Sequence, residues 1–230
     1  MSIRRIQYQI DYVHIITFRE EYKIAVAPYF GFDKLEYGID NENTIHEGIR
    51  LIFKTEQIAL ILRKDAITLI YEGDVEELKK QNGVIKLFWD LYEKIKSFQA
   101  YVKTTRHSLL VHAVKIKDKK EVEEMLLKNP YLSLNPFGKL DEFSCVYEVK
   151  KEEVDYKMQF GNYTEKDIKK HDLTPLKTSF NEDLINGLGI MGRLDITEME
   201  KNPNFTKFKS LLTKAENTLA LFNLLEEDEK

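Results

Sequence analysis

The chain has only one cysteine among its 230 residues, which excludes several kinds of site. Cys145 cannot form a disulfide within the chain, and a thiolate zinc site would need partners that the sequence lacks. A reducing compartment agrees with this composition. Because Cys145 alternates with apolar residues in a strand-like run, we expect it to be a buried structural residue.

Glycine and proline are also scarce, with 10 and 5 residues, so long flexible linkers are not expected. No apolar run approaches the roughly 18 residues of a membrane span. The first residues, MSIRRIQYQIDY, have no long apolar core and no cleavage pattern, so we expect no signal peptide. These absences predict a cytoplasmic protein that has no membrane partner.

The net charge of -4 gives no overall attraction toward nucleic acid. The segment 94–120 differs, because it contains eight lysines and arginines and a single acid, Asp118. Within it, YVKTTRH places a stacking ring beside cationic groups, an arrangement that suits a phosphate-bearing ligand. A solvated helix end and strand edge explains the same charges. The candidate ligand-binding residues are Tyr101, Lys103, Arg106 and His107.

Alternating apolar residues predict an α+β protein whose sheet is mostly antiparallel. We expect strands over 6–12, 108–117 and 190–198, a meander over 49–71, and a hairpin over 143–160. The polar segments 32–47 and 162–178 are expected to be loops. No period of 20–50 residues repeats, which excludes a solenoid. We expect a single domain over 1–230, with a division into two lobes near 118–141 as the alternative.

Two or three helices should pack on this sheet. Asp74 with Glu77 predicts one helix start, and the helix that follows should place Trp89 inside. Asn202-Pro203 predicts the start of a C-terminal amphipathic helix. Its apolar stripe suits either packing on the sheet or a homodimer seam, although additional leucines widen it and favour packing within the chain. The stripe consists of Phe205, Phe208, Leu212, Leu219 and Phe222.

The segment NGLGIMGRLDI carries Gly187, Gly189 and Gly192 at the spacing of a dinucleotide-binding turn. That turn needs a strand before it and a helix at its last glycine. Here the preceding residues predict a short helix that Gly187 would end, and the following residues predict a strand. We therefore expect no cofactor, with Gly189 and Gly192 marking a tight turn and a bulge or close backbone approach.

The five histidines show no metal-binding or catalytic spacing, so no metal site is expected. His112 alternates with Leu110 and Val114, which favours a hydrogen-bonded core histidine. His171-Asp172 lies in a polar segment, and adjacency in sequence seldom orients a catalytic dyad. Asp195 stands between two apolar residues of a strand and should point away from their face.

The order of elements resembles a sporadically distributed bacterial family of uncharacterised α+β proteins. The resemblance covers the meander IFKTEQIALILRKDAITLIYEG, the aromatic helix IKLFWDLYEKIKSF, the strand GIMGRLDI and the helix FKSLLTKAENTLALFNLL. The strand HSLLVHAVKI departs from the family's arginine-aromatic run. The resemblance implies a fold but no established activity, and the sporadic distribution suits a role in bacterial defence or phage counter-defence.

These observations favour a non-enzymatic binding or regulatory protein, whose partner is another protein or a second copy of itself. The alternative is a protein that handles nucleotides or nucleic acid with the basic 94–120 segment. The sequence assigns no catalytic residue.

Overall fold

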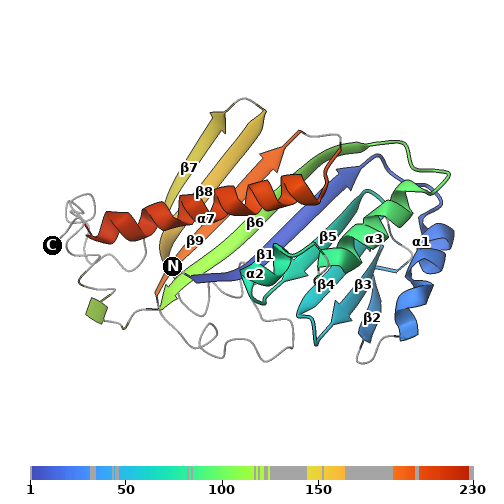
Figure 1. The fold of residues 1–230 in the computed structure, drawn as a ribbon, viewed down its shortest axis with the longest axis horizontal. Coiled ribbons are helices and arrows are strands. Elements are labelled where there is room, and N and C mark those ends of the chain that lie inside the picture. Colours follow the sequence, from blue (N-terminus) through green and yellow to red (C-terminus); the bar gives the residue numbers. More distant parts are fainter. Residues whose placement is uncertain are drawn as a thin grey trace.

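One antiparallel sheet organises the molecule (Figure 1). The computed structural model describes residues 2–31, 35–42, 44, 47–81, 83, 85–116, 118, 120–121, 124, 144–151, 153–163, 189–199 and 202–227. In these residues a 9-stranded sheet has the order β2-β3-β4-β5-β1-β6-β9-β8-β7. The strands are β1 (Ser2–Tyr12), β2 (Leu35–Asp40), β3 (Gly48–Phe53), β4 (Ile58–Arg63), β5 (Ala66–Tyr71), β6 (Thr104–Ile116), β7 (Ser144–Lys151), β8 (Val154–Tyr163) and β9 (Gly189–Glu198). The predicted α+β class with an antiparallel sheet is confirmed.

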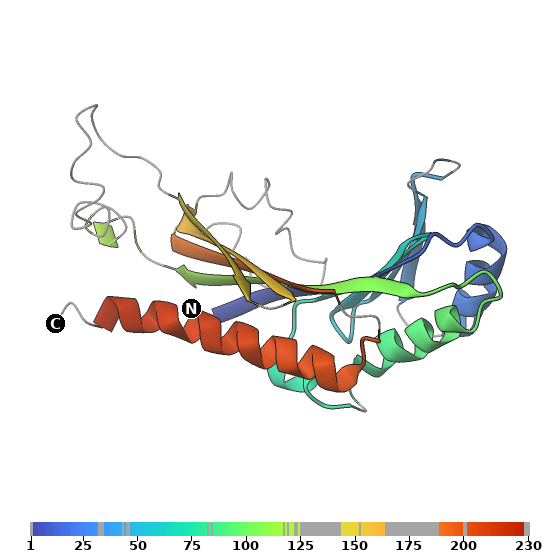
Figure 2. The same ribbon diagram turned by 90° about the horizontal axis from the view of Figure 1, so that it is seen from above.

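Helices pack on one face of this sheet. Figure 2 shows α2 (Val75–Leu78), α3 (Ile85–Lys96) and α7 (Phe205–Glu227) on the same side of it. The helix α1 (Phe18–Val26) and the short 3-10 helix η1 (Ala27–Gly31) lie at one end of the sheet, where α1 contacts α3. None of these helices covers the opposite face, which we call the open face.

The core lies between the sheet and the helices. In β1, every second side chain points into this core. Alternate residues of β1, among them Tyr8 and Ile10, point toward the helices and are fully buried. The ring of Tyr8 lies 5.5 Å from that of Phe88 in α3 and 4.8 Å from that of Phe208 in α7, centroid to centroid. One tyrosine therefore contacts both long helices from the centre of the sheet.

Most predicted elements appear close to their expected positions. The meander over 49–71 is β3, β4 and β5, and the hairpin over 143–160 is β7 and β8. Asp74 caps α2 as predicted, because its carboxylate accepts a hydrogen bond from the backbone N–H of Glu76 at 3.0 Å. The ring of Trp89 is half-buried and packs against the core.

Two boundaries differ from the prediction. The expected loop over 32–47 contains β2, whose few apolar residues give a weak strand signal and whose carboxylates form ion pairs with Arg50 and Lys54 of the next strand. The last helix begins at Phe205, with Asn204 rather than Asn202 as its cap. The side-chain oxygen of Asn204 accepts the backbone N–H of Lys207 at 3.0 Å.

The glycine motif lies partly in a regular strand. Gly189 and Gly192 belong to β9 and pair in continuous register with β6 and β8, so the predicted turn and bulge are wrong. Gly192 has Ala113 and Phe160 as its neighbours across the strands, and no helix begins there. Gly187 and most of the expected 162–178 loop lie outside the described residues.

The apolar stripe of α7 packs within its own chain. Phe208, Leu212 and Leu219 are buried, and Phe205 is partly buried against the same core. The side chain of Phe222 lies outside the described part. The described members of the stripe therefore contribute to the core, which is the first of the two alternatives for this helix.

Replacing Leu212 with alanine is expected to lower the free energy of unfolding by about 2–4 kcal/mol, the range for truncating a buried leucine. Leu212 has no exposed surface. Urea unfolding measures the change, and Lys209→Ala on the exposed side of the same helix is the control, expected within about 0.5 kcal/mol of wild type. A Leu212→Ala protein of unchanged stability that passes from dimer to monomer in light scattering would contradict the core assignment.

Candidate functional site

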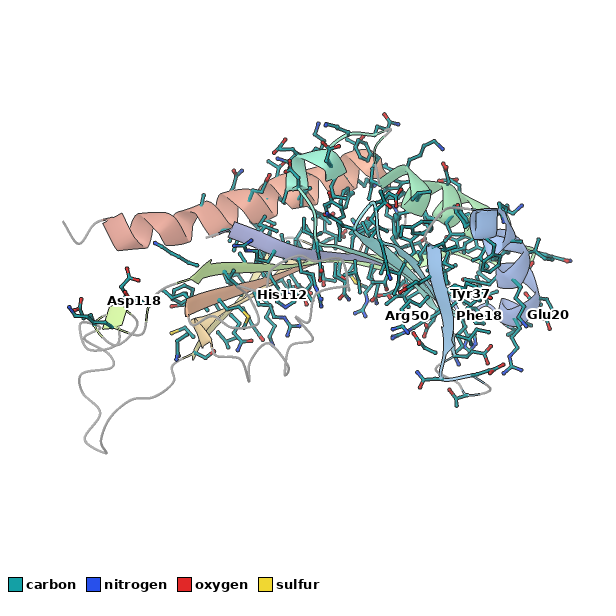
Figure 3. All side chains as sticks on the ribbon, turned by 90° about the horizontal axis from the view of Figure 1, so that it is seen from below. Phe18, Glu20, Tyr37, Arg50, His112 and Asp118 are labelled. Carbon is teal, nitrogen blue, oxygen red and sulfur yellow. The ribbon has the colours of Figure 1, made fainter. Side chains whose placement is uncertain are left out.

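Polar side chains cross the open face in rows, because residues paired across antiparallel strands point to the same face. One row joins Arg5 of β1, His112 of β6 and Arg193 of β9. Figure 3 shows His112 on the side of the sheet away from α7. His112 is buried, as predicted. The next row runs Gln7, Leu110, Asp195, Lys157 and Glu148.

A groove of about 400 Å³ lies over the outer strands of the open face. Two ion pairs join β7 to β8 beside it, Lys157 with Glu148 at 2.7 Å and Lys150 with Asp155 at 3.7 Å. The groove therefore combines three carboxylates with two ammonium groups and carries little net charge. Its lining residues are Glu148, Val149, Lys150, Asp155, Tyr156, Lys157, Asp195 and Thr197.

Asp195 is a partly buried carboxylate in this groove, and its burial disfavours the charged form. Burial raises the pKa of Asp195, while Arg193, a hydrogen bond from Thr197 and the charges of Arg106 and Lys157 act in the opposite direction. The hydroxyl of Thr197 donates to the carboxylate across 3.5 Å, a long contact. A carboxylate that loses water without gaining a close partner favours binding of a cationic group. The predicted direction of Asp195, away from the apolar face, is confirmed.

The four residues of the predicted ligand site do not form one cluster. Arg106 and His107 are neighbours in β6 and point to opposite faces. On the open face, Arg106 forms an ion pair with Asp11 of β1. Lys103 is exposed before β6 begins, and the hydroxyl of Tyr101 lies 2.7 Å from that of Thr104.

His107 belongs to a buried chain of polar groups on the helix side. Its Nδ1 lies 2.9 Å from the hydroxyl of Tyr8, and its Nε2 lies 3.4 Å from a carboxylate oxygen of Glu198. Lys214 of α7 completes the chain with an ion pair to Glu198 at 2.9 Å. Burial raises the pKa of Tyr8, so its hydroxyl stays protonated. This chain links β1, β6, β9 and α7, and it runs from the buried Tyr8 and His107 to the partly exposed Lys214.

The sequence contained little signal for the groove. Its lining comes from three strands, and each charged residue resembles ordinary solvent-facing charge along the chain. The prediction for Cys145 is wrong, because its strand lies at the sheet edge and its side chain is exposed. Among the described residues no three metal-ligating side chains come together.

Comparison of the chain with family models and with curated proteins found no match to either. In the described helices, none is both long and apolar enough to cross a membrane. The function must therefore be argued from the geometry of the open face.

A buried ion pair anchors this face at its centre. Arg5 donates from Nε to Glu72 at 2.8 Å, and both side chains are almost completely buried. Glu72→Gln removes the carboxylate that pairs with the buried arginine, which is expected to cost about 3–5 kcal/mol in a urea unfolding experiment. Asp90→Asn, which removes an exposed pair with Lys86, should cost less than about 0.5 kcal/mol. Equal costs for the two variants would contradict the role of burial.

Proposed function

We propose that this chain is a non-enzymatic binding protein that holds a segment of a polypeptide partner in the groove on the open face. The observation that carries the proposal is the partly buried carboxylate of Asp195 in a groove lined by both signs of charge. Each of these groups gains from an oppositely charged side chain when water leaves the interface. A polypeptide offers ammonium, guanidinium and carboxylate groups on one molecule.

A nucleic acid suits the same groove poorly. Its phosphates would meet three carboxylates, Glu148, Asp155 and Asp195, against two lysines. The positive charges of the 94–120 segment that the structure describes do not gather on the open face either. Lys96 pairs with Glu93 on α3, and Arg106 pairs with Asp11 on the open face. These pairs reduce the positive field that would attract phosphate.

Asp195→Asn is expected to raise stability and weaken binding together. Because burial raises the pKa of Asp195 above its ordinary value of 3.8, the folded protein binds this proton more tightly than the unfolded chain. Its contribution to stability is thus full below that value and is lost as the pH rises through the folded pKa. The variant should exceed wild type in stability at pH 7 and approach it at low pH. Urea unfolding at several pH values measures this, with the exposed Asp155→Asn as the control.

Binding is tested with short random linear peptides displayed on phage and selected on the full chain. We expect selected peptides to carry basic residues, and Asp195→Asn to weaken them about tenfold in fluorescence anisotropy, as for loss of one charge-assisted contact. Single-stranded and duplex oligonucleotides are measured in parallel at low and high salt. Salt-sensitive oligonucleotide binding without any selected peptide would overturn the proposal and favour the nucleic-acid alternative.

A further inference from the structure

The two halves of the chain repeat one order of elements. In the first half β1 leads through α1 to a meander and then to α3 (Figure 1). In the second half β6 leads to β7, β8 and β9 and then to α7. The sheet order is symmetric about its centre, so that β1 corresponds to β6, β5 to β9, β4 to β8 and β3 to β7.

The strand registers agree with this symmetry. Gln7 pairs with Leu110, and each lies at the middle of its strand, so a two-fold axis through this pair exchanges β1 and β6. The same operation brings the partner of Gln7 in β5, Ile70, onto the partner of Leu110 in β9, Asp195. We infer an internally duplicated architecture, which a search for periods of 20–50 residues would not detect.

The symmetry is broken at the outer edge. In the first half β2 pairs with β3 along its whole length. Its apolar residues face the helix side, where Tyr37 lies across from Leu51. On the open face, its carboxylates form ion pairs with Arg50 and Lys54. In the described residues of the second half, β7 occupies the place equivalent to β3, and no strand occupies the place equivalent to β2.

The edge of β7 has the properties of a surface that accepts a strand. Every residue of β7 is exposed. On the helix side, Tyr147 and Val149 expose 52% and 58% of their surface and form an apolar pair along the strand. On the open face the groove begins at Glu148 and Lys150 and extends to Asp195. An edge strand also presents backbone N–H and C=O groups to an added strand.

We propose that the free edge of β7 pairs with an extended segment of a partner protein, in the place that β2 takes beside β3. This inference rests on the proposed function and specifies how the partner binds. The segment alternates apolar residues, which cover Tyr147 and Val149, with charged residues, which lie on the open face beside Glu148 and Lys150, where the groove begins. The sequence LEYGID of β2 shows the same alternation at the equivalent place.

A second copy of this chain fits the edge less well than a different protein. The charged residues that β7 turns to the open face, Glu148 and Lys150, are already in ion pairs with β8. A second β7 would therefore bring no new cation toward Asp195. A dimer through β7 is nevertheless an outcome that light scattering of the selected complexes and of the free chain would reveal, and it would overturn the proposal.

The test uses the full chain, the peptides selected on it, and hydrogen exchange read by mass spectrometry. In the free chain we expect fast exchange at those amides of residues 144–151 that point away from β8, and slow exchange at the same amides when a selected peptide is bound. Val149→Lys, at an exposed site, should weaken the peptide at least about tenfold, because an edge lysine opposes strand pairing. Tyr37→Lys is the matched control, since Tyr37 is also exposed, faces the same side, and lies at the opposite edge of the sheet. It should leave the affinity unchanged.

The outcomes separate the two proposals. Suppose that Asp195→Asn weakens the peptides, that Val149→Lys leaves their affinity unchanged, and that bound peptide does not slow exchange in 144–151. This result would overturn strand pairing, while the proposed binding in the groove would stand. Slow exchange, in the free chain, at the amides of 144–151 that point away from β8 would mean that the chain covers this edge itself and would also overturn the inference. If no peptide is selected, both proposals fail. If Val149→Lys loses its cooperative unfolding, Tyr147→Lys replaces it with the same expectation, because Tyr147 is exposed in the same strand and does not line the groove.

Discussion

The antiparallel pairing of β1 with β6 is the constraint on which the rest of the molecule depends. It is the contact that joins the first half of the sheet to the second, since each other strand pair lies within one half. Both strands are longer than their outer neighbours β5 and β9, and their helix-side residues are buried. Because the pairing places Tyr8 and Leu109 side by side beneath the helices, one core serves both halves. A one-residue shift in this register would turn every core side chain of one half toward the open face.

The same period of two determines the character of the open face. When alternate residues of a strand point into the core, the remaining residues form rows on the other side, where polar and charged side chains can be accommodated. This explains why residues distant in sequence, such as Asp11 and Arg106 or Arg5 and Glu72, meet there as ion pairs. It also explains why adjacent residues that resemble a site along the chain, such as Arg106 and His107, are separated by the thickness of the sheet. The candidate site is thus a property of the strand order, which single-sequence patterns do not contain.

Some strands and residues could be predicted from the sequence, and others could not. The strands with strict alternation or strong β-branched content, β1, β3, β4, β5 and β9, were predictable because their apolar period is local information. The strand β2 was missed, because its few apolar residues give a weak local signal, whereas its pairing with β3 and its ion pairs with Arg50 and Lys54 join residues distant in sequence. Cys145 alternates as a buried residue would, yet its exposure depends on whether another strand lies beside β7, which is again a matter of topology. Of the groove, only the direction of Asp195 followed from its neighbours in sequence.

Equivalent positions in the two halves of the sheet differ in residue type on the open face. A row across the open face passes through Ile52, Ala59 and Ile70 in the first half. By the two-fold relation, the same row continues through Asp195, Lys157 and Glu148 in the second half. Apolar residues occupy these positions in the first half. The sheet can therefore form without charged residues at the equivalent positions of the second half. In the second half the equivalent positions carry three charged residues, one of them a carboxylate whose pKa is raised by burial. In the part of the chain that the structure describes, the same half has no strand at the place of β2. The charged row and the unpaired edge of β7 therefore lie in the same half of the sheet, so both departures from the two-fold relation occur together.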